Sequence, residues 1–172
     1  MIDSGYPEPL FLDDIDEEEK AYYFAYGSNM DETQMGKRCS DSQLEGKALL
    51  PGYRLVFNRE SSGWGCGVAD IVLDDQTEVW GLLYEVTDND LKQLDYYEGA
   101  PKLYVRKKIK VLDASNNEIN ANTYEVVKKN GFIPPSEEYL GILKKAAEKY
   151  GFPQKYKDYL KTIQVKAHKE NI

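Results

Sequence analysis

Two short segments of the chain carry the side chains best suited to chemistry. The first is Tyr26-Gly27-Ser28-Asn29, which follows the apolar run Ala21–Ala25. The second is Glu98, which ends a predicted helix and is followed by Gly99. A polar turn that opens a helix can bind an anion, and a carboxyl group can accept and donate protons.

The elements around the first segment explain why it could bind an anion. Ala21–Ala25 predicts a buried strand, and Asp31–Met35 is compatible with a helix, so the chain is expected to turn at residues 27–29. A helix start offers unpaired N–H groups and a partial positive charge, and Gly27 lets a ligand approach the backbone. Ser28 or Asn29 could also cap the helix. The same tetrapeptide is ordinary turn chemistry, which is the alternative interpretation.

The second segment places carboxylates where a helix disfavours them. A helix ends in partial negative charge, so Asp95 and Glu98 are expected to cost some helix stability there. The helix dipole, together with burial under Tyr96 and Tyr97, would raise the pKa of Glu98. A raised pKa suits a group that both takes and gives a proton. The alternative is that Asp95 and Glu98 are solvated surface carboxylates.

Composition narrows the classes of function. The chain has 172 residues and a net charge of −8, which argues against nucleic-acid binding. Its densest basic cluster, Arg106 to Lys110, predicts a solvated strand face, with a phosphate-binding patch as the lesser alternative. The single histidine, His168, lies in a polar tail, so acid–base chemistry is expected from other side chains. Cys39 and Cys66 indicate neither a disulfide framework nor a zinc site.

The pattern along the chain predicts a single α+β domain. We expect an acidic flexible leader over residues 1–20, one domain over 21–165 and a polar tail over 166–172. No apolar run approaches the length of a membrane span, and a cytoplasmic location is expected by default. Six strands are predicted, over residues 21–25, 49–58, 68–73, 78–86, 104–112 and 119–127. A glycine-rich loop is expected at 61–67 and a turn at 74–76.

Helical periodicity completes the predicted fold. It indicates helices over residues 88–97, with Leu91 and Leu94 facing inward, and from Glu137 to Tyr150, with another helix beginning at Pro153. These elements predict a small, mostly antiparallel, β-barrel-like sheet with peripheral helices.

The order of these segments resembles the γ-glutamylcyclotransferase (AIG2-like) family, and its animal-type members in particular. The similarity spans about residues 22–163. It is carried by Tyr23-Phe24-Ala25-Tyr26-Gly27-Ser28-Asn29, Glu78-Val79-Trp80-Gly81, Leu94-Asp95-Tyr96-Tyr97-Glu98-Gly99, Tyr104, Pro134-Pro135-Ser136 and Tyr139.

The resemblance implies a reaction that needs no cofactor and no metal. In that family the α-amine of a γ-glutamyl group attacks its own γ-carbonyl and releases 5-oxoproline and a free amine or amino acid. Carried onto this sequence, Glu98 is the general acid and base. The substrate-binding residues implied are Tyr23, Tyr26, Gly27, Ser28, Asn29, Met30, Tyr104 and Tyr139.

Alternatives to this enzyme stay open at the level of sequence. A non-catalytic module that binds γ-glutamyl groups or small carboxylates would keep the loop without turnover. A structural interaction protein would use the acidic leader. The resemblance also implies a homodimer, and the partner expected for the enzyme is a small γ-glutamyl compound whose leaving group the sequence does not define. Cys66 is expected to be a buried packing residue.

Overall fold

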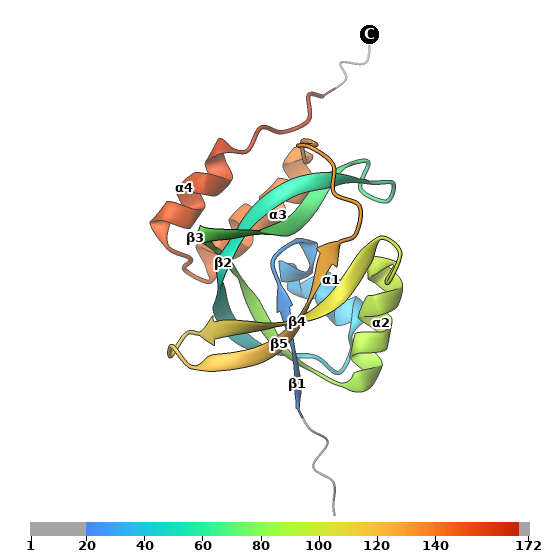
Figure 1. Cartoon of the computed structure of the whole chain (residues 1–172), viewed down its shortest axis with the longest axis vertical. Coiled ribbons are helices and arrows are strands. Elements are labelled where there is room, and N and C mark those ends of the chain that lie inside the picture. Colours follow the sequence, from blue (N-terminus) through green and yellow to red (C-terminus); the bar gives the residue numbers. More distant parts are fainter. Residues whose placement is uncertain (1–19, 169–172) are drawn as a thin grey trace, which may run out of the picture.

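The chain forms a closed five-stranded barrel with helices around it (Figure 1). The computed structural model describes residues 20–168, so the predicted leader, apart from Lys20, lies outside the described residues. The strands are β1 (Ala21–Ala25), β2 (Gln43–Ser61), β3 (Cys66–Val86), β4 (Tyr104–Asp113) and β5 (Glu118–Val126), in the spatial order β1-β3-β2-β4-β5. All pairs are antiparallel except β1 with β5. The predicted α+β barrel is confirmed.

The helices lie in two groups beside the barrel. One group is the short 3-10 helix η1 (Ser28–Met30), α1 (Glu32–Arg38) and α2 (Asp88–Glu98), and the other is α3 (Glu137–Lys149) with α4 (Gln154–Thr162). Figure 1 shows α1 and α2 on one side and α3 and α4 on another. Of the helices within residues 20–168, none is long and apolar enough to cross a membrane.

Local signals explain where the two site-bearing helices begin. Thr87 and Asp90 form a reciprocal capping box at the start of α2, and Leu91 and Leu94 bury its inner face as predicted. Ser136 caps α3 by accepting from the Tyr139 backbone N–H at 3.0 Å. These caps fix where α2 and α3 begin.

One sequence prediction about the sheet is wrong. The predicted turn at 74–76 does not reverse the chain, because residues 68–73 and 78–86 belong to one strand, β3. Tyr53 pairs with Leu73 and Pro51 with Glu78, so residues 74–77 bulge out opposite Gly52 of β2. The residues of this bulge are polar, like those of a turn. The sequence therefore predicted six strands where the structure has five.

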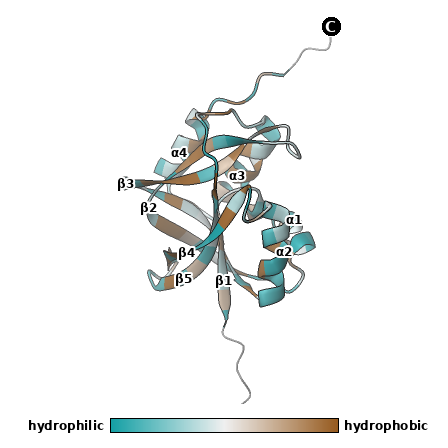
Figure 2. Ribbon diagram, turned by 45° about the vertical axis from the view of Figure 1, so that its right-hand side comes forward, coloured by the Kyte–Doolittle hydropathy of each residue, from teal (hydrophilic) through white to brown (hydrophobic). Residues whose placement is uncertain are grey.

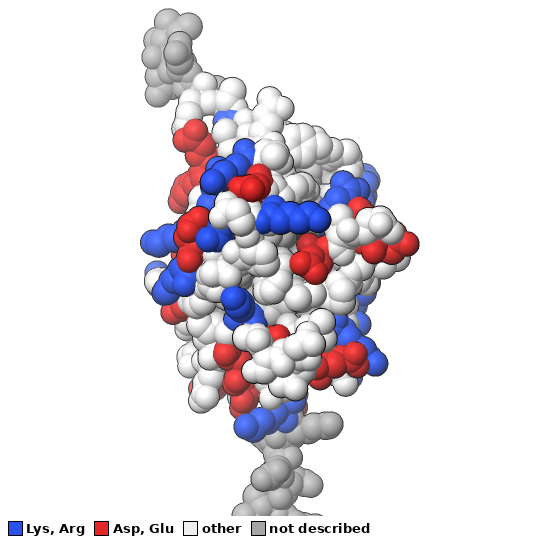
Figure 3. All heavy atoms as spheres, turned by 90° about the vertical axis from the view of Figure 1, so that its left-hand side faces the viewer, with Lys and Arg blue, Asp and Glu red and all other residues white. Residues whose placement is uncertain are grey.

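The interior is mainly apolar and the surface carries both signs of charge. Figure 2 shows hydrophobic residues along the strands and hydrophilic ones over much of α1 and α2. Phe24, Phe57 and Leu82 are among the largest fully buried side chains. On the face shown in Figure 3, acidic and basic side chains are interspersed. The barrel therefore supplies a rigid core, and polar chemistry concentrates where strands and helices end.

Candidate active site

The end of β1, the end of α2 and Tyr139 of α3 meet at one pocket. Its volume is about 460 Å³. The turn between β2 and β3 and the start of β4 complete the wall. Eight of the nine predicted site residues line it: Tyr23, Tyr26, Gly27, Ser28, Asn29, Glu98, Tyr104 and Tyr139. Residues up to 116 positions apart in sequence, from Tyr23 to Tyr139, are thus brought together.

The ninth predicted residue and the helix start differ from expectation. Met30 does not line the pocket, and its side chain is packed in the core. The chain after β1 forms η1 rather than opening α1 directly, and the cap of α1 is Asp31, not Ser28 or Asn29. Because the Asp31 carboxylate accepts from Thr33 N–H at 2.9 Å, the start of α1 is already occupied. An anion would therefore have to meet the first N–H groups of η1.

Asn29 is the buried centre of the polar contacts in the pocket. Its amide Nδ2 donates to the Tyr23 hydroxyl at 3.0 Å and to Glu98 Oε1 at 3.4 Å. Its Oδ1 accepts from Gln34 Nε2 and from an Arg38 guanidinium nitrogen, both at 3.0 Å. Two donors on Oδ1 fix which way the amide points, so the Nδ2 group faces the Glu98 carboxylate.

Burial raises the pKa of Glu98, and the positive charges of Arg38 and Arg59 lower it. Burial is the larger effect, so the pKa of Glu98 is about 7. The predicted direction is confirmed, but one predicted cause holds only in part. Tyr96 is 79% exposed and does not line the pocket, whereas Tyr97, 47% exposed, is one of the residues that line it with Glu98. The walls of the pocket, Tyr97 among them, bury Glu98. Near pH 7 this group can exist in both its acid and its base form.

Asp95 has a structural role, one turn before Glu98. Its Oδ1 accepts from the Tyr124 hydroxyl at 2.6 Å and lies 3.3 Å from Arg106 Nε. These contacts tie the last turn of α2 to β4 and β5. Asp95 is therefore neither a pocket residue nor a free surface carboxylate.

The tyrosines of the pocket are held as neutral hydroxyl groups. Burial raises the pKa of Tyr23, Tyr26, Tyr104 and Tyr139 above the usual range. Tyr104 donates to the Ala69 carbonyl at 3.0 Å, while the Ala69 N–H donates to the Tyr139 hydroxyl at 3.0 Å. Tyr26 donates to the Tyr124 carbonyl. A backbone group thus fixes Tyr26, Tyr104 and Tyr139 at the wall, and the Asn29 side chain holds Tyr23.

Two arginines line the pocket that sequence analysis did not single out. Arg38 lies over the Tyr97 ring and Arg59 over the Tyr104 ring, with 4.8 and 5.3 Å to the ring centres. Neither arginine forms a salt bridge with a carboxylate of residues 20–168. Arg38 follows Gln34 by one helical turn, a spacing that could have indicated their shared face.

The turn between β2 and β3 closes one side of the pocket. Ser61, Ser62, Gly63 and Trp64 line it, and the Trp64 ring packs edge-on against Tyr139 with 5.1 Å between centres. Cys66 is buried and does not line the pocket, as expected of a packing residue.

A second hollow of about 1150 Å³ lies over β4 and the start of α2. It contains the predicted basic cluster, but three of its cations are paired, which favours a solvated strand face over a phosphate site. The pairs are Arg106–Asp95, Lys107–Glu125 and Lys110–Glu118. Within the described part of the chain, no group of three or more His, Cys, Asp or Glu side chains could hold a metal ion.

Comparison with known proteins agrees with this architecture. Residues 23–141 match the family described as "Gamma-glutamyl cyclotransferase, AIG2-like". The human gamma-glutamylcyclotransferase is 31% identical over 153 residues, which are 86% of this chain and 81% of the human one, and the mouse protein is 30% identical over 91% and 85%. A solved gamma-glutamyl cyclotransferase superposes with a TM-score of 0.81 at 29% identity, covering 87% of this chain and 91% of that one.

The chain belongs to the γ-glutamyl cyclotransferase, AIG2-like family. Membership confirms the resemblance and the prediction that the protein is an enzyme of the cyclotransferase class. The fold confirmed above is also that of the solved relative.

Proposed function

We propose that this chain cyclises γ-glutamyl α-amino acids to 5-oxoproline and a free amino acid, with Glu98 as the general acid and base. The observation that carries the proposal is the half-buried Glu98 carboxyl beside Asn29, whose pKa is raised to about 7. A group with that pKa can accept a proton and return it at neutral pH.

The proposed reaction balances through this one carboxyl group. Glu98 accepts a proton from the substrate α-ammonium, and the freed amine nitrogen attacks the γ-carbonyl carbon. A five-membered ring closes, and Glu98 gives this proton to the γ-amide nitrogen as its bond to the γ-carbon breaks. The ring nitrogen then loses its second proton through Glu98 to the departing amine, which leaves as an ammonium group. The attacking and attacked atoms are tethered, so a bent substrate has a high effective concentration, on the order of 10⁵ M or more.

The pocket also suggests where the charges of the substrate lie. Tyr26 and the Gly27–Asn29 turn would hold the γ-glutamyl half, with η1 N–H groups toward its α-carboxylate. Neutral tyrosine hydroxyls and the same N–H groups are candidate donors to the oxygen that becomes negative during attack. Tyr104 and Tyr139 would form the opposing wall.

The charge balance of the pocket favours an amino acid as the leaving group. Arg38, Arg59 and ionised Glu98 sum to a net charge of +1. A γ-glutamyl derivative of a neutral α-amino acid carries two carboxylates and one ammonium, hence −1, whereas a γ-glutamyl-alkylamine carries no net charge. The second carboxylate would satisfy a guanidinium that is otherwise left without a counter-charge.

The test is detection of 5-oxoproline by mass spectrometry. The panel contains γ-glutamyl-alanine, a γ-glutamyl-alkylamine and glutathione, and compares wild type with Glu98→Gln and with Glu118→Gln, an exposed control on β5. We expect Glu98→Gln to lose about 10²- to 10⁴-fold in turnover while still binding substrate. No product from wild type would overturn the proposed reaction. Unchanged turnover in Glu98→Gln would overturn the role of Glu98.

A further inference from the structure

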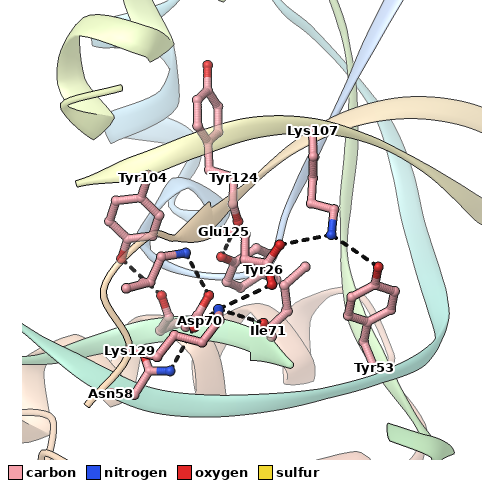
Figure 4. Close-up of polar contacts among 12 residues, drawn as sticks. Tyr26, Tyr53, Asn58, Asp70, Ile71, Tyr104, Lys107, Tyr124, Glu125 and Lys129 are labelled. Atoms are coloured by element: carbon pink, nitrogen blue, oxygen red, sulfur yellow. Dashed lines mark hydrogen bonds and ion pairs between the residues drawn. The ribbon is translucent and has the colours of Figure 1, made fainter. Parts of the chain in front are cut away.

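Behind the pocket lies a fully buried carboxylate, Asp70 of β3, with 0% of its surface exposed. It does not line the pocket, although its neighbour Ala69 does. Its Oδ1 accepts from the Val126 backbone N–H at 2.9 Å. Its Oδ2 accepts from Asn58 Nδ2 at 2.7 Å and from Lys129 Nζ at 2.6 Å. Figure 4 shows this carboxylate between β3 and the hairpin of β4 and β5.

Asp70 stands where one edge of β3 meets side chains rather than a strand. On one edge, β3 pairs with β2 at this level, Val56 opposite Asp70. On the other edge, its described partner β1 pairs with residues 82–86. Buried backbone groups at this free edge still need partners. The Ala69 N–H and carbonyl find them in the hydroxyls of Tyr139 and Tyr104.

These contacts close a ring that contains a pocket residue. Asp70 holds the N–H of Val126, the last residue of β5, and Val126 is the register partner of Tyr104 on β4. The Tyr104 hydroxyl returns to the Ala69 carbonyl, next to Asp70 in the chain. The Asp70 carboxylate therefore sets how far β3 stands from the β4–β5 hairpin at the level of Tyr104.

Ala69 also contacts the two other walls of the pocket. Its N–H donates to the Tyr139 hydroxyl. A Cβ built on Gly27 would lie 3.4 Å from Ala69 Cβ and 2.9 Å from the Tyr139 hydroxyl. A shift of β3 at Ala69 would consequently move Tyr104, Tyr139 and the space beside Gly27 together.

We propose that Asp70 is a positioning residue for the active site, acting through its clamp on Val126 to place Tyr104 and Tyr139 around the substrate. The proposal rests on the function proposed above, since it assigns those tyrosines to the substrate pocket. Asp70 touches neither substrate nor Glu98 and is not a catalytic residue.

The clamp is expected to depend on the acceptor atom more than on charge. Lys129 bridges Asp70 and Glu125, and Lys107 pairs with Glu125, so this network holds two carboxylates and two ammonium groups. Its net charge is zero. What the network supplies to the pocket is therefore a fixed geometry.

The chain offers a conservative substitution that separates these roles. Asp70→Asn keeps an oxygen for the Val126 N–H. The new amide nitrogen would face two donors, Asn58 Nδ2 and Lys129 Nζ. The buried Asn58 Oδ1 has no hydrogen-bond partner among the described residues, so a flip of Asn58 lets it accept from the new amide, and the exposed Lys129 can turn to Glu125, with which it already pairs. Asp70→Ala removes the acceptor. We expect kcat to fall at least tenfold in Asp70→Ala with KM within threefold, and to stay within threefold of wild type in Asp70→Asn.

The matched control is Asp75→Ala, an exposed aspartate on the same strand, for which kcat should match wild type. Rates are expressed per folded molecule, with folding monitored by circular dichroism. If Asp70→Ala does not fold, Asp70→Ala/Lys129→Met replaces it, because this variant removes both partners of the Asp70–Lys129 ion pair. An Ala variant within threefold of wild type, or an Asn variant as slow as the Ala variant, overturns the proposal.

A second measurement is independent of turnover. Hydrogen exchange at the Val126 and Ala69 amides, followed by NMR, should accelerate at least tenfold in Asp70→Ala and stay near wild type in Asp70→Asn. If hydrogen exchange at these amides is the same in Asp70→Ala as in wild type, Asp70 does not hold Val126 in place and the proposal is overturned, whatever the rate of the reaction. Absence of 5-oxoproline from wild type would instead overturn the proposed function, so the two failures are distinguishable.

Discussion

The side-chain amide of Asn29 donates to the Glu98 carboxylate at 3.4 Å, which joins the turn after β1 to the last residue of α2. The two residues are 69 positions apart in the chain. Gly99, in the left-handed conformation with φ 63°, ends α2 directly after Glu98 and lets the chain leave the pocket. The contact thus links the two segments that the sequence marks for chemistry.

The raised pKa of Glu98 predicts the pH dependence of the reaction. The base form accepts the ammonium proton, so kcat/KM should rise with pH through an acidic limb whose midpoint is about 7. Initial rates between pH 5 and 9 measure it. A limb near pH 4.5, the usual value for Glu, would contradict the environment described for this carboxyl.

The same shift predicts how stability depends on pH. Because the pKa of Glu98 is about 7 in the folded state and near 4.5 when unfolded, the folded state holds more protons between these values. The contribution to stability is present below pH 4.5 and lost as pH rises through 7. Glu98→Gln should therefore raise the free energy of unfolding at pH 8 by up to about 3 kcal/mol, and leave it nearly unchanged at pH 4. Urea denaturation at both pH values checks this sign.

Replacing Arg59 should change the choice of leaving group. Arg59→Met removes a guanidinium that lines the pocket, so KM for γ-glutamyl-alanine should rise about tenfold or more, whereas KM for a γ-glutamyl-alkylamine should change little. Arg54→Met is the matched control, since Arg54 lies on the same strand and pairs with Asp74 outside the pocket. Equal effects on both substrates would contradict a carboxylate-binding role.

Gly27→Ala should disturb the site through Tyr139. A Cβ at this position would lie 2.9 Å from the Tyr139 hydroxyl, closer than real side chains approach, so the ring has to move. We expect kcat/KM to fall at least tenfold. The control is Gly141→Ala in α3, which has open space around it and should stabilise the helix by about 0.5–1 kcal/mol. Full activity in Gly27→Ala would show that this contact is not needed.

Gly67→Ala should mainly lower stability. The Gly67 N–H donates to the Pro134 carbonyl at 2.9 Å, and an added Cβ would lie only 1.8 Å from the Ile133 carbonyl oxygen. The segment before α3 would be displaced, at an expected cost of about 3 kcal/mol in the free energy of unfolding. Thermal denaturation beside Gly36→Ala, where nothing lies within 4 Å, provides the comparison.

Local patterns were sufficient to predict most elements and the two chemical segments. The capped helices starting after Thr87 and Ser136, and the alternating hairpin of β4 and β5, follow from signals within a few residues. The predicted burial of Glu98 beneath Tyr96 is wrong because Tyr96 is 79% exposed and lies away from the pocket, whereas Tyr97 lines it. The contacts of Asp70 and the placement of Arg38 and Arg59 at one pocket depend on how distant elements pack. Local sequence patterns do not contain this information.

The turn between β2 and β3 and the residue proposed for proton transfer lie on different parts of the fold. Ser61 and Cys66 pair at its base, so the four residues between them can change while the ribbon stays in register. Glu98 and the Gly27–Asn29 turn lie on other elements. Under the proposed function, exchange of this tip is therefore expected to reshape the wall of the pocket beside Tyr139, which Trp64 contacts, while Glu98 stays in place.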